Sequence, residues 1–214
     1  MKQLSDNYAA MFQDVLWDNC LALLKSPWKR DRNPGAPSAF GETHLRNYVQ
    51  KALKSRLYIP PSTWPQLVVE RGVQGDRKDA AHRHGAVDYF FTAKGDERSL
   101  HLSDLLASCE VGGPTRPKLL AGSQANWYPK IVADIEKQLW RASHAGTGHH
   151  FVSVFIQPRS GYEVEADFGA VLRTMIIPLP DATLGDVVWS RRADDVPDLH
   201  LVTLRVLPHN SSAF

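Results

Sequence analysis

Three apolar stretches, 66-QLVVERGV-73, 86-AVDYFFTA-93 and 105-LLASCEV-111, decide the fold. Each is short, rich in β-branched or aromatic residues, and bounded by polar or glycine-rich sequence, which is typical of β-strands. The segments between them are short, so we expect the three strands to form an antiparallel meander. The third strand should stop at the Gly-Gly-Pro sequence that follows residue 111.

Helical patterns lie on both sides of this meander. Residues 5–24 repeat apolar side chains at helical spacing, and Ser5 is a suitable N-cap. A second helix is predicted over residues 42–57, where one apolar stripe runs up to a cluster of prolines. A third helix is predicted over residues 129–140, and FVSVFI at 151–156 reads as a strand buried on both faces.

The C-terminal part is less regular. Residues 171–179 and 199–207 could be strands, and residues 181–189 a short helix or a loop. We therefore expect a single α/β (or α+β) domain over residues 1–214, with a central mixed sheet flanked by helices. Its three parts are an N-terminal helix and loop (1–41), a core (42–157) and a mixed C-terminal extension (158–214).

Composition excludes several classes of protein. The chain has 214 residues, of which 43% are hydrophobic and 22% charged, so a disordered chain is excluded. No apolar run approaches the roughly 18 residues of a membrane span, and the N-terminus lacks the apolar region of a secretory signal. The two cysteines, Cys20 and Cys109, form no disulfide framework. We expect a cytoplasmic protein with no membrane partner.

The charge is nearly balanced overall but uneven along the chain. The formal net charge is +2. Residues 1–60 hold 9 basic and 5 acidic side chains, whereas residues 151–214 hold 5 basic and 8 acidic ones. A polyanion would therefore contact the first segment rather than the last, unless the charges are simply scattered over the surface.

Four acidic residues fall at informative places: Glu42, Glu70, Asp88 and Glu110. A charge within an apolar strand is costly to bury unless it is paired or binds a metal. Antiparallel strands can bring Asp88 and Glu110 side by side, where two carboxylates can hold Mg²⁺. Such an ion can deliver hydroxide and stabilise charge on a phosphodiester.

Each acid also has a structural interpretation. Glu70 and Asp88 could lie on the solvent face of the sheet, and Glu110 could simply end a strand. Glu42 could complement the dipole of the helix that it begins. On the third helix, Asp134 and Lys137 could form an exposed pair.

Three motifs resemble the PD-(D/E)XK nuclease-like superfamily over residues 42–157: GAVDYFF at 85–91, SCEVGGP at 108–114 and KIVADIEKQL at 130–139. The resemblance implies a restriction-endonuclease-like fold and metal-dependent cleavage of DNA or RNA, as an endonuclease or an exonuclease. It implies that Asp88 and Glu110, with Glu70, bind Mg²⁺ or Mn²⁺. Glu70 and Glu42 are candidates for the accessory carboxylate.

One position departs from the family pattern. Gly112 stands two residues after Glu110, where the family has a lysine that orients or activates the attacking water. The amine could come instead from Lys118, Lys130 or Lys137. Alternatively, hydrolysis has been lost, and the domain is a module that binds nucleic acid, a protein partner or a second copy of itself.

Overall fold

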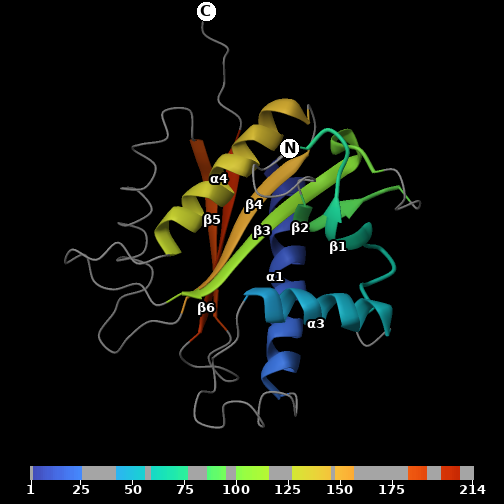
Figure 1. The fold of residues 1–214 in the computed structure, drawn as a ribbon, viewed down its shortest axis with the longest axis vertical. Coiled ribbons are helices and arrows are strands. Elements are labelled where there is room, and N and C mark those ends of the chain that lie inside the picture. The colour runs from blue at the N-terminus through green and yellow to red at the C-terminus, as the bar shows by residue number, and fades with distance from the viewer. Residues whose placement is uncertain are drawn as a thin grey trace, which may run out of the picture.

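A computed structural model describes nine segments of the chain: residues 2–25, 42–55, 59–76, 86–94, 100–115, 127–145, 148–156, 183–191 and 199–207. These segments form an α/β structure in which helices flank one mixed sheet of six strands (Figure 1). This arrangement confirms the α/β class and the central mixed sheet. Among the described helices, none combines the length and apolar character needed to cross a bilayer.

The elements follow the order expected from the sequence in the first two thirds of the chain. They are α1 (Lys2–Lys25), α3 (Glu42–Lys54), β1 (Gln66–Gly72), β2 (Ala86–Thr92), a 3-10 turn η2 (Leu102–Asp104), β3 (Leu105–Thr115), α4 (Trp127–His144), β4 (His149–Ile156), β5 (Thr183–Arg191) and β6 (His200–Leu207).

The sheet has the strand order β1-β2-β3-β4-β6-β5. β1, β2 and β3 pair antiparallel as a meander, as expected. β4 then pairs parallel to β3, because α4 carries the chain back to the end at which β3 began. β6 and β5 continue the sheet in antiparallel pairing.

Helices cover both faces of the sheet. α1 and α3 pack on one face, where Phe12, Trp17 and Val49 join a core that includes Tyr89 and Phe155. α4 packs on the other face against β3 and β4 (Figure 1). Strands covered on both faces are buried throughout, and β4 is buried at every residue after its first.

The third strand is longer than the sequence predicts, so the expectation that it stops at the glycines is wrong. β3 continues to Thr115 because parallel β4 pairs with it across from Gly112 and Thr115. Gly113 has a positive φ of +104°, and a Cβ there would collide with the Phe155 carbonyl oxygen. The glycine therefore permits a close approach between strands rather than ending one.

The C-terminal region adds two strands. Residues 199–207 contain β6, which confirms a strand there. Residues 181–189 were expected to be a short helix or a loop, but Thr183–Arg191 form β5. A register shift between Leu184 and Val187 accommodates the intervening residues, so the ladder with β6 resumes. The stretch 171–179 lies outside the described residues.

Candidate functional site

Asp88 on β2 and Glu110 on β3 lie beside one another where the two strands separate. Tyr89 and Cys109 form the last residue pair between these strands. Asp88 and Glu110 come next, one on each strand, just beyond this pair. Beyond this pair, the Val111 amide donates a hydrogen bond to Asp88 Oδ2 at 3.0 Å. The Asp88 carboxylate thus takes the place of a backbone carbonyl as the acceptor for this amide.

Both acids are buried. Asp88 is 6% exposed and Glu110 is 1% exposed. The solvent-face interpretation of Asp88 is therefore wrong, because the helices that cover the sheet also cover this residue. Glu110 lies within β3, five residues before its end, so it does not terminate the strand either.

Each acid forms an ion pair with an arginine from a helix. Arg46 on α3 lies 3.2 Å from Asp88 Oδ1. Arg141 on α4 donates a hydrogen bond from Nη1 to Glu110 Oε1. These arginines were missed in the sequence analysis. The apolar pattern gave no signal for Arg141, because it lies beyond the helix predicted over 129–140 and the residues three and four positions before it are Gln138 and Lys137.

Arg141 also anchors the loop after β1. Its Nε and Nη2 atoms donate to the two carboxylate oxygens of Asp76 at 3.0 and 2.9 Å. The Arg141 and Asp76 side chains are 2% and 1% exposed. This bidentate geometry fixes the guanidinium, so Glu110 is held by a group that is itself immobile.

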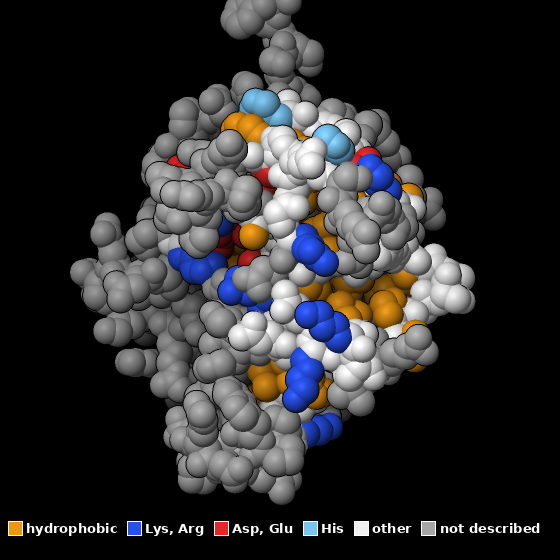
Figure 2. All heavy atoms as spheres, turned by 45° about the vertical axis from the view of Figure 1, so that its right-hand side comes forward, with side chains coloured by type: hydrophobic (Ala, Val, Ile, Leu, Met, Phe, Trp, Pro, Cys, Tyr) orange, Lys and Arg blue, Asp and Glu red, His pale blue; other side chains and the backbone are white. Residues whose placement is uncertain are grey.

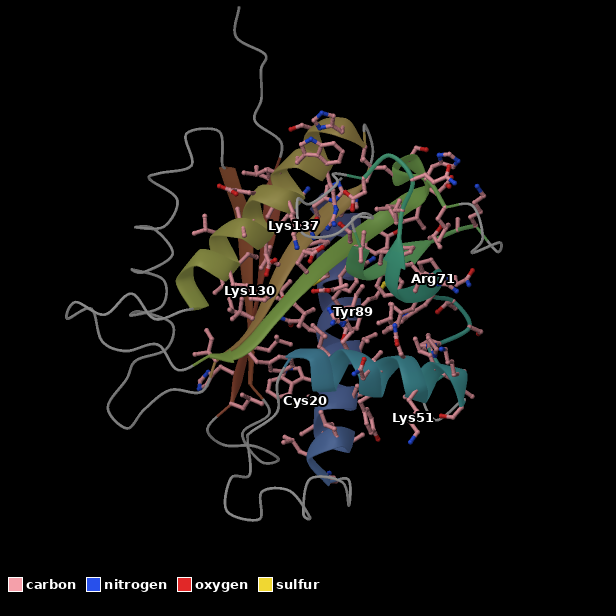
Figure 3. The ribbon with its side chains drawn as sticks, in the orientation of Figure 1. Cys20, Lys51, Arg71, Tyr89, Lys130 and Lys137 are labelled. Carbon is pink, nitrogen blue, oxygen red and sulfur yellow. The ribbon has the colours of Figure 1, made fainter. Side chains whose placement is uncertain are left out.

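Among the described lysines, Lys137 lies near the Glu110 carboxylate. Its Nζ lies 3.7 Å from Glu110 Oε2 and 3.6 Å from Asp134 Oδ1. Lys130 instead forms an ion pair with Asp134 Oδ2 at 2.9 Å. Both lysines come from α4, which crosses β3 and β4 (Figure 3). Asp134 is 3% exposed, so Asp134 and Lys137 are not the exposed pair considered above.

The remaining expected residues are not all described. Lys118 lies outside the described residues, as do the side chains of Glu42 and Glu70. The backbone of Glu70 belongs to β1, where its neighbours Val69 and Arg71 pair with Tyr89 and Val87. The backbone of Glu70 is therefore across the ladder from that of Asp88.

Burial and neighbouring charges shift the pKa values in the site. Desolvation raises the pKa of Glu110, and repulsion by Asp88 raises it further, against the attraction of Arg141. Desolvation also raises the pKa of Asp134. Burial alone would lower the pKa of Lys137, but attraction by Glu110 and Asp134 outweighs it, so the pKa is raised. Lys137 is consequently an ammonium at neutral pH.

A neutral polar network lies next to Glu110. Ser108 Oγ is 2.8 Å from His150 Nδ1 and donates to Gln138 Oε1 at 2.9 Å. Gln138 Nε2 donates to the Phe151 carbonyl at 2.7 Å. Desolvation, with repulsion by Arg141, lowers the pKa of His150 to about 3. The imidazole is therefore neutral and structural.

The ion pairs leave the described site electrically balanced. Four acids (Asp76, Asp88, Glu110 and Asp134) face four bases (Arg46, Lys130, Lys137 and Arg141). Within the described residues, no group of three or more His, Cys, Asp or Glu side chains is arranged to hold a metal ion. On one face, acidic side chains lie set back beneath Lys and Arg side chains (Figure 2).

The site and fold define an α/β protein with a buried acid–base cluster at the β2–β3 junction. Comparison with protein-family models, with curated proteins and with solved structures finds no match to this chain.

Proposed function

We propose that this protein is a metal-dependent nuclease with a PD-(D/E)XK-like, restriction-endonuclease-like core. One observation carries the proposal: Lys137 Nζ lies 3.7 Å from Glu110 Oε2, beside the strand that presents Asp88. Two carboxylates and an amine are thus brought together from β2, β3 and α4. The amine comes from α4 rather than from the position of Gly112.

The order of the elements supports this proposal. The resemblance implies a helix, three consecutive strands, a helix and a further strand. Here α3 precedes the β1-β2-β3 meander, and α4 leads into β4. Asp88 and Glu110 lie on the second and third strands of the meander, as the motifs require.

The donor chemistry fits a hard divalent cation. Carboxylate oxygens are the ligands that Mg²⁺ and Mn²⁺ prefer. Glu110 Oε2 accepts no hydrogen bond from the part of the chain that the structure describes, because Lys137 is 3.7 Å away. Asp88 and Glu110 would hold the ion, which would supply a hydroxide nucleophile and Lewis-acid polarisation of the phosphodiester.

Two of the neighbouring cations can make room for such an ion. The side chains of Arg46 and Lys137 are 21% and 33% exposed, so each reaches the acids from the rim of the site. Arg141, at 2%, is fixed by Asp76 and stays. Arg46 and Lys137 therefore neutralise the acids in the free protein and can turn toward a bound phosphate.

The protonation of Lys137 defines its role. Its raised pKa keeps the amine protonated at neutral pH, so it can stabilise negative charge or donate a proton, and it is a poor general base. We assign to Lys137 the stabilisation of charge that develops on the phosphodiester.

Calorimetric titration with Mn²⁺ or Mg²⁺ tests the proposal at its first step. The protein should bind the ion, and Glu110→Gln and Asp88→Asn should each weaken binding by at least about tenfold. Lys94→Gln, at the other end of β2, is the control and should bind as the unmodified protein does. Absence of metal binding by the unmodified protein would refute the proposal.

The second candidate is a nuclease-like module that has lost hydrolysis and binds nucleic acid or a protein partner. The pairing of each described acid of the site with a base favours it, because carboxylates that are already paired do not require a cation. A domain of this kind would give no heat with either metal and would still bind its partner.

A further inference from the structure

The segment that contains α3 has an unusual charge pattern. Between Glu42 and Glu70 the sequence contains no acidic residue, but it contains four basic ones: Arg46, Lys51, Lys54 and Arg56. A helix surface with several basic and few acidic side chains attracts polyanions. On the face shown in Figure 2, Lys and Arg side chains follow one another with few acidic side chains between them.

One row of α3 begins at the candidate site. Arg46, Gln50 and Lys54 are spaced by four residues and therefore share one side of the helix. Arg46 contacts Asp88 at 3.2 Å, and Gln50 Nε2 donates to the Val69 carbonyl at 3.4 Å. Lys54 is exposed at the far end of the row. The row spans about 12 Å, the axial length of three to four nucleotides of one strand.

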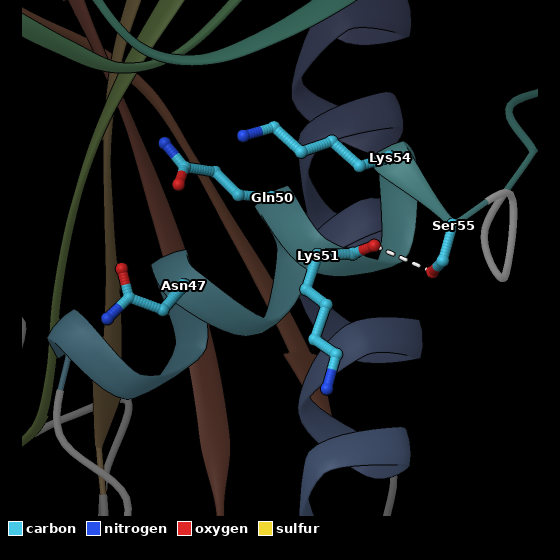
Figure 4. A pocket seen from close by; sticks show the side chains of 5 residues that line it. All are labelled: Asn47, Gln50, Lys51, Lys54 and Ser55. Atoms are coloured by element: carbon cyan, nitrogen blue, oxygen red, sulfur yellow. Dashed lines mark hydrogen bonds between the residues drawn. The ribbon is translucent and has the colours of Figure 1, made fainter.

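A second row forms the edge of an open pocket. Asn47, Lys51 and Ser55 are also spaced by four residues, and with Gln50 and Lys54 they line this pocket (Figure 4). Gln50 and Lys54 extend in the same direction from the helix, whereas Lys51 extends away from them on the neighbouring row. Neither Lys51 nor Lys54 forms an ion pair with another described residue.

We propose that this face of α3, formed by Asn47, Gln50, Lys51 and Lys54, binds the phosphodiester backbone of the nucleic acid that enters the Asp88–Glu110 site. This inference rests on the proposed nuclease function, because that function is the reason why the nucleic acid would run from α3 into the Asp88–Glu110 site. Lys51 and Lys54 neutralise phosphates, while the exposed Asn47 amide donates a hydrogen bond. Contacts of this kind position a strand and carry no sequence preference.

Binding should therefore depend on salt in a defined way. Each lysine that neutralises a phosphate releases a counterion, and the slope of log K against log salt becomes steeper by about 0.9 for duplex DNA. Loss of two such contacts should reduce the magnitude of the slope by about two, whatever the sequence.

Fluorescence anisotropy with labelled 20-mer probes tests the inference in EDTA, so that no cleavage occurs. The test variant is Lys51→Gln/Lys54→Gln. The control is Lys94→Gln/Arg205→Gln, which removes the same charge from the far end of β2 and from β6. Comparing the affinities for duplex DNA, single-stranded DNA and RNA of one sequence shows which nucleic acid the protein prefers. Circular dichroism verifies that each variant is folded.

We expect the test variant to bind at least about tenfold more weakly at 100 mM salt, with the reduced slope, and the control to change less than about twofold. Equal losses in both variants, or no binding by the unmodified protein, would overturn the inference. The two proposals fail separately. Normal metal-dependent cleavage with unchanged binding in the test variant refutes only the α3 surface, whereas lysine-dependent binding without cleavage refutes only the nuclease.

Discussion

Lys137 and Glu110 face one another across the gap between α4 and β3, with 3.7 Å between Nζ and Oε2. One turn further along α4, Arg141 donates to the other oxygen of the same carboxylate. The helix therefore supplies two cations to Glu110, one fixed and one partly exposed. Under the proposed function, Lys137 supplies the amine that the family pattern would place at Gly112.

Replacing Lys137 by methionine should slow metal-dependent cleavage by about 10² or more, because the charge on the phosphodiester loses its nearest ammonium. Initial rates with a labelled DNA duplex and Mn²⁺ measure the effect. Lys94→Met makes the same chemical change at a distance and should retain the full rate. Equal rates for Lys137→Met and the unmodified protein would remove Lys137 from the site.

A lysine at position 112 should restore part of this loss. Gly112 lies two residues after Glu110 on β3, so its side chain would share the face of Glu110. A Cβ added there meets no heavy atom within 4 Å. We expect Gly112→Lys/Lys137→Met to cleave at least about tenfold faster than Lys137→Met. Gly112→Ala/Lys137→Met is the control for the backbone change, and rescue by alanine would contradict the charge argument.

Arg141 should be essential for stability. Arg141→Met removes the guanidinium that pairs with the buried carboxylates of Asp76 and Glu110, which costs about 3–5 kcal/mol. Urea unfolding followed by circular dichroism measures the free energy of unfolding. Lys94→Met breaks the more exposed ion pair with Asp104 and should lower the free energy of unfolding far less. Similar losses of unfolding free energy in the two variants would show that the buried Asp76–Arg141–Glu110 ion pairs stabilise the fold no more than an exposed pair does.

Acid should destabilise the protein through His150. Its pKa is about 3 in the folded protein against 6.5 in the unfolded chain, so below pH 6.5 the unfolded state binds the additional proton. Stability should fall from pH 6.5 toward pH 3, with about 2 kcal/mol lost between pH 7 and pH 5. In His150→Gln, the free energy of unfolding should fall by about 2 kcal/mol less between pH 7 and pH 5 than in the unmodified protein. The same fall in both proteins would contradict this role of His150.

The sheet could be predicted from the sequence where strands have short, apolar patterns. The ranges of β1, β2 and β4 follow from short apolar runs with turn residues around them, and only FVSVFI of β4 was expected to be covered on both faces. The continuation of β3 through Gly112 and Gly113 could not be predicted, because it depends on pairing with β4, whose place in the sheet the sequence does not specify. β5 was missed because Gly185 and Asp186 interrupt its pattern, and the ladder with β6 compensates for them.

The candidate site could be predicted only in part. Asp88 and Glu110 stand out as charges in apolar strands, and the register brings their strands together. The partners Arg46, Asp76 and Arg141 come from a helix face, a loop and another helix, so only the packing of these elements shows the contacts. Of the three lysines that the sequence allowed, Lys137 lies near Glu110 and Lys130 pairs with Asp134, whereas Lys118 is outside the described residues.

Cleavage of a labelled DNA duplex is the most direct test of the central claim, that Asp88 and Glu110 support metal-dependent phosphodiester hydrolysis. The assay compares the unmodified protein with Asp88→Asn and Glu110→Gln in Mn²⁺, in Mg²⁺ and in EDTA, after circular dichroism has verified each fold. The account predicts cleavage that requires the metal and that is at least about 10² slower in both variants. Cleavage at the normal rate in both variants, or an intact duplex with the unmodified protein in either metal, would contradict it.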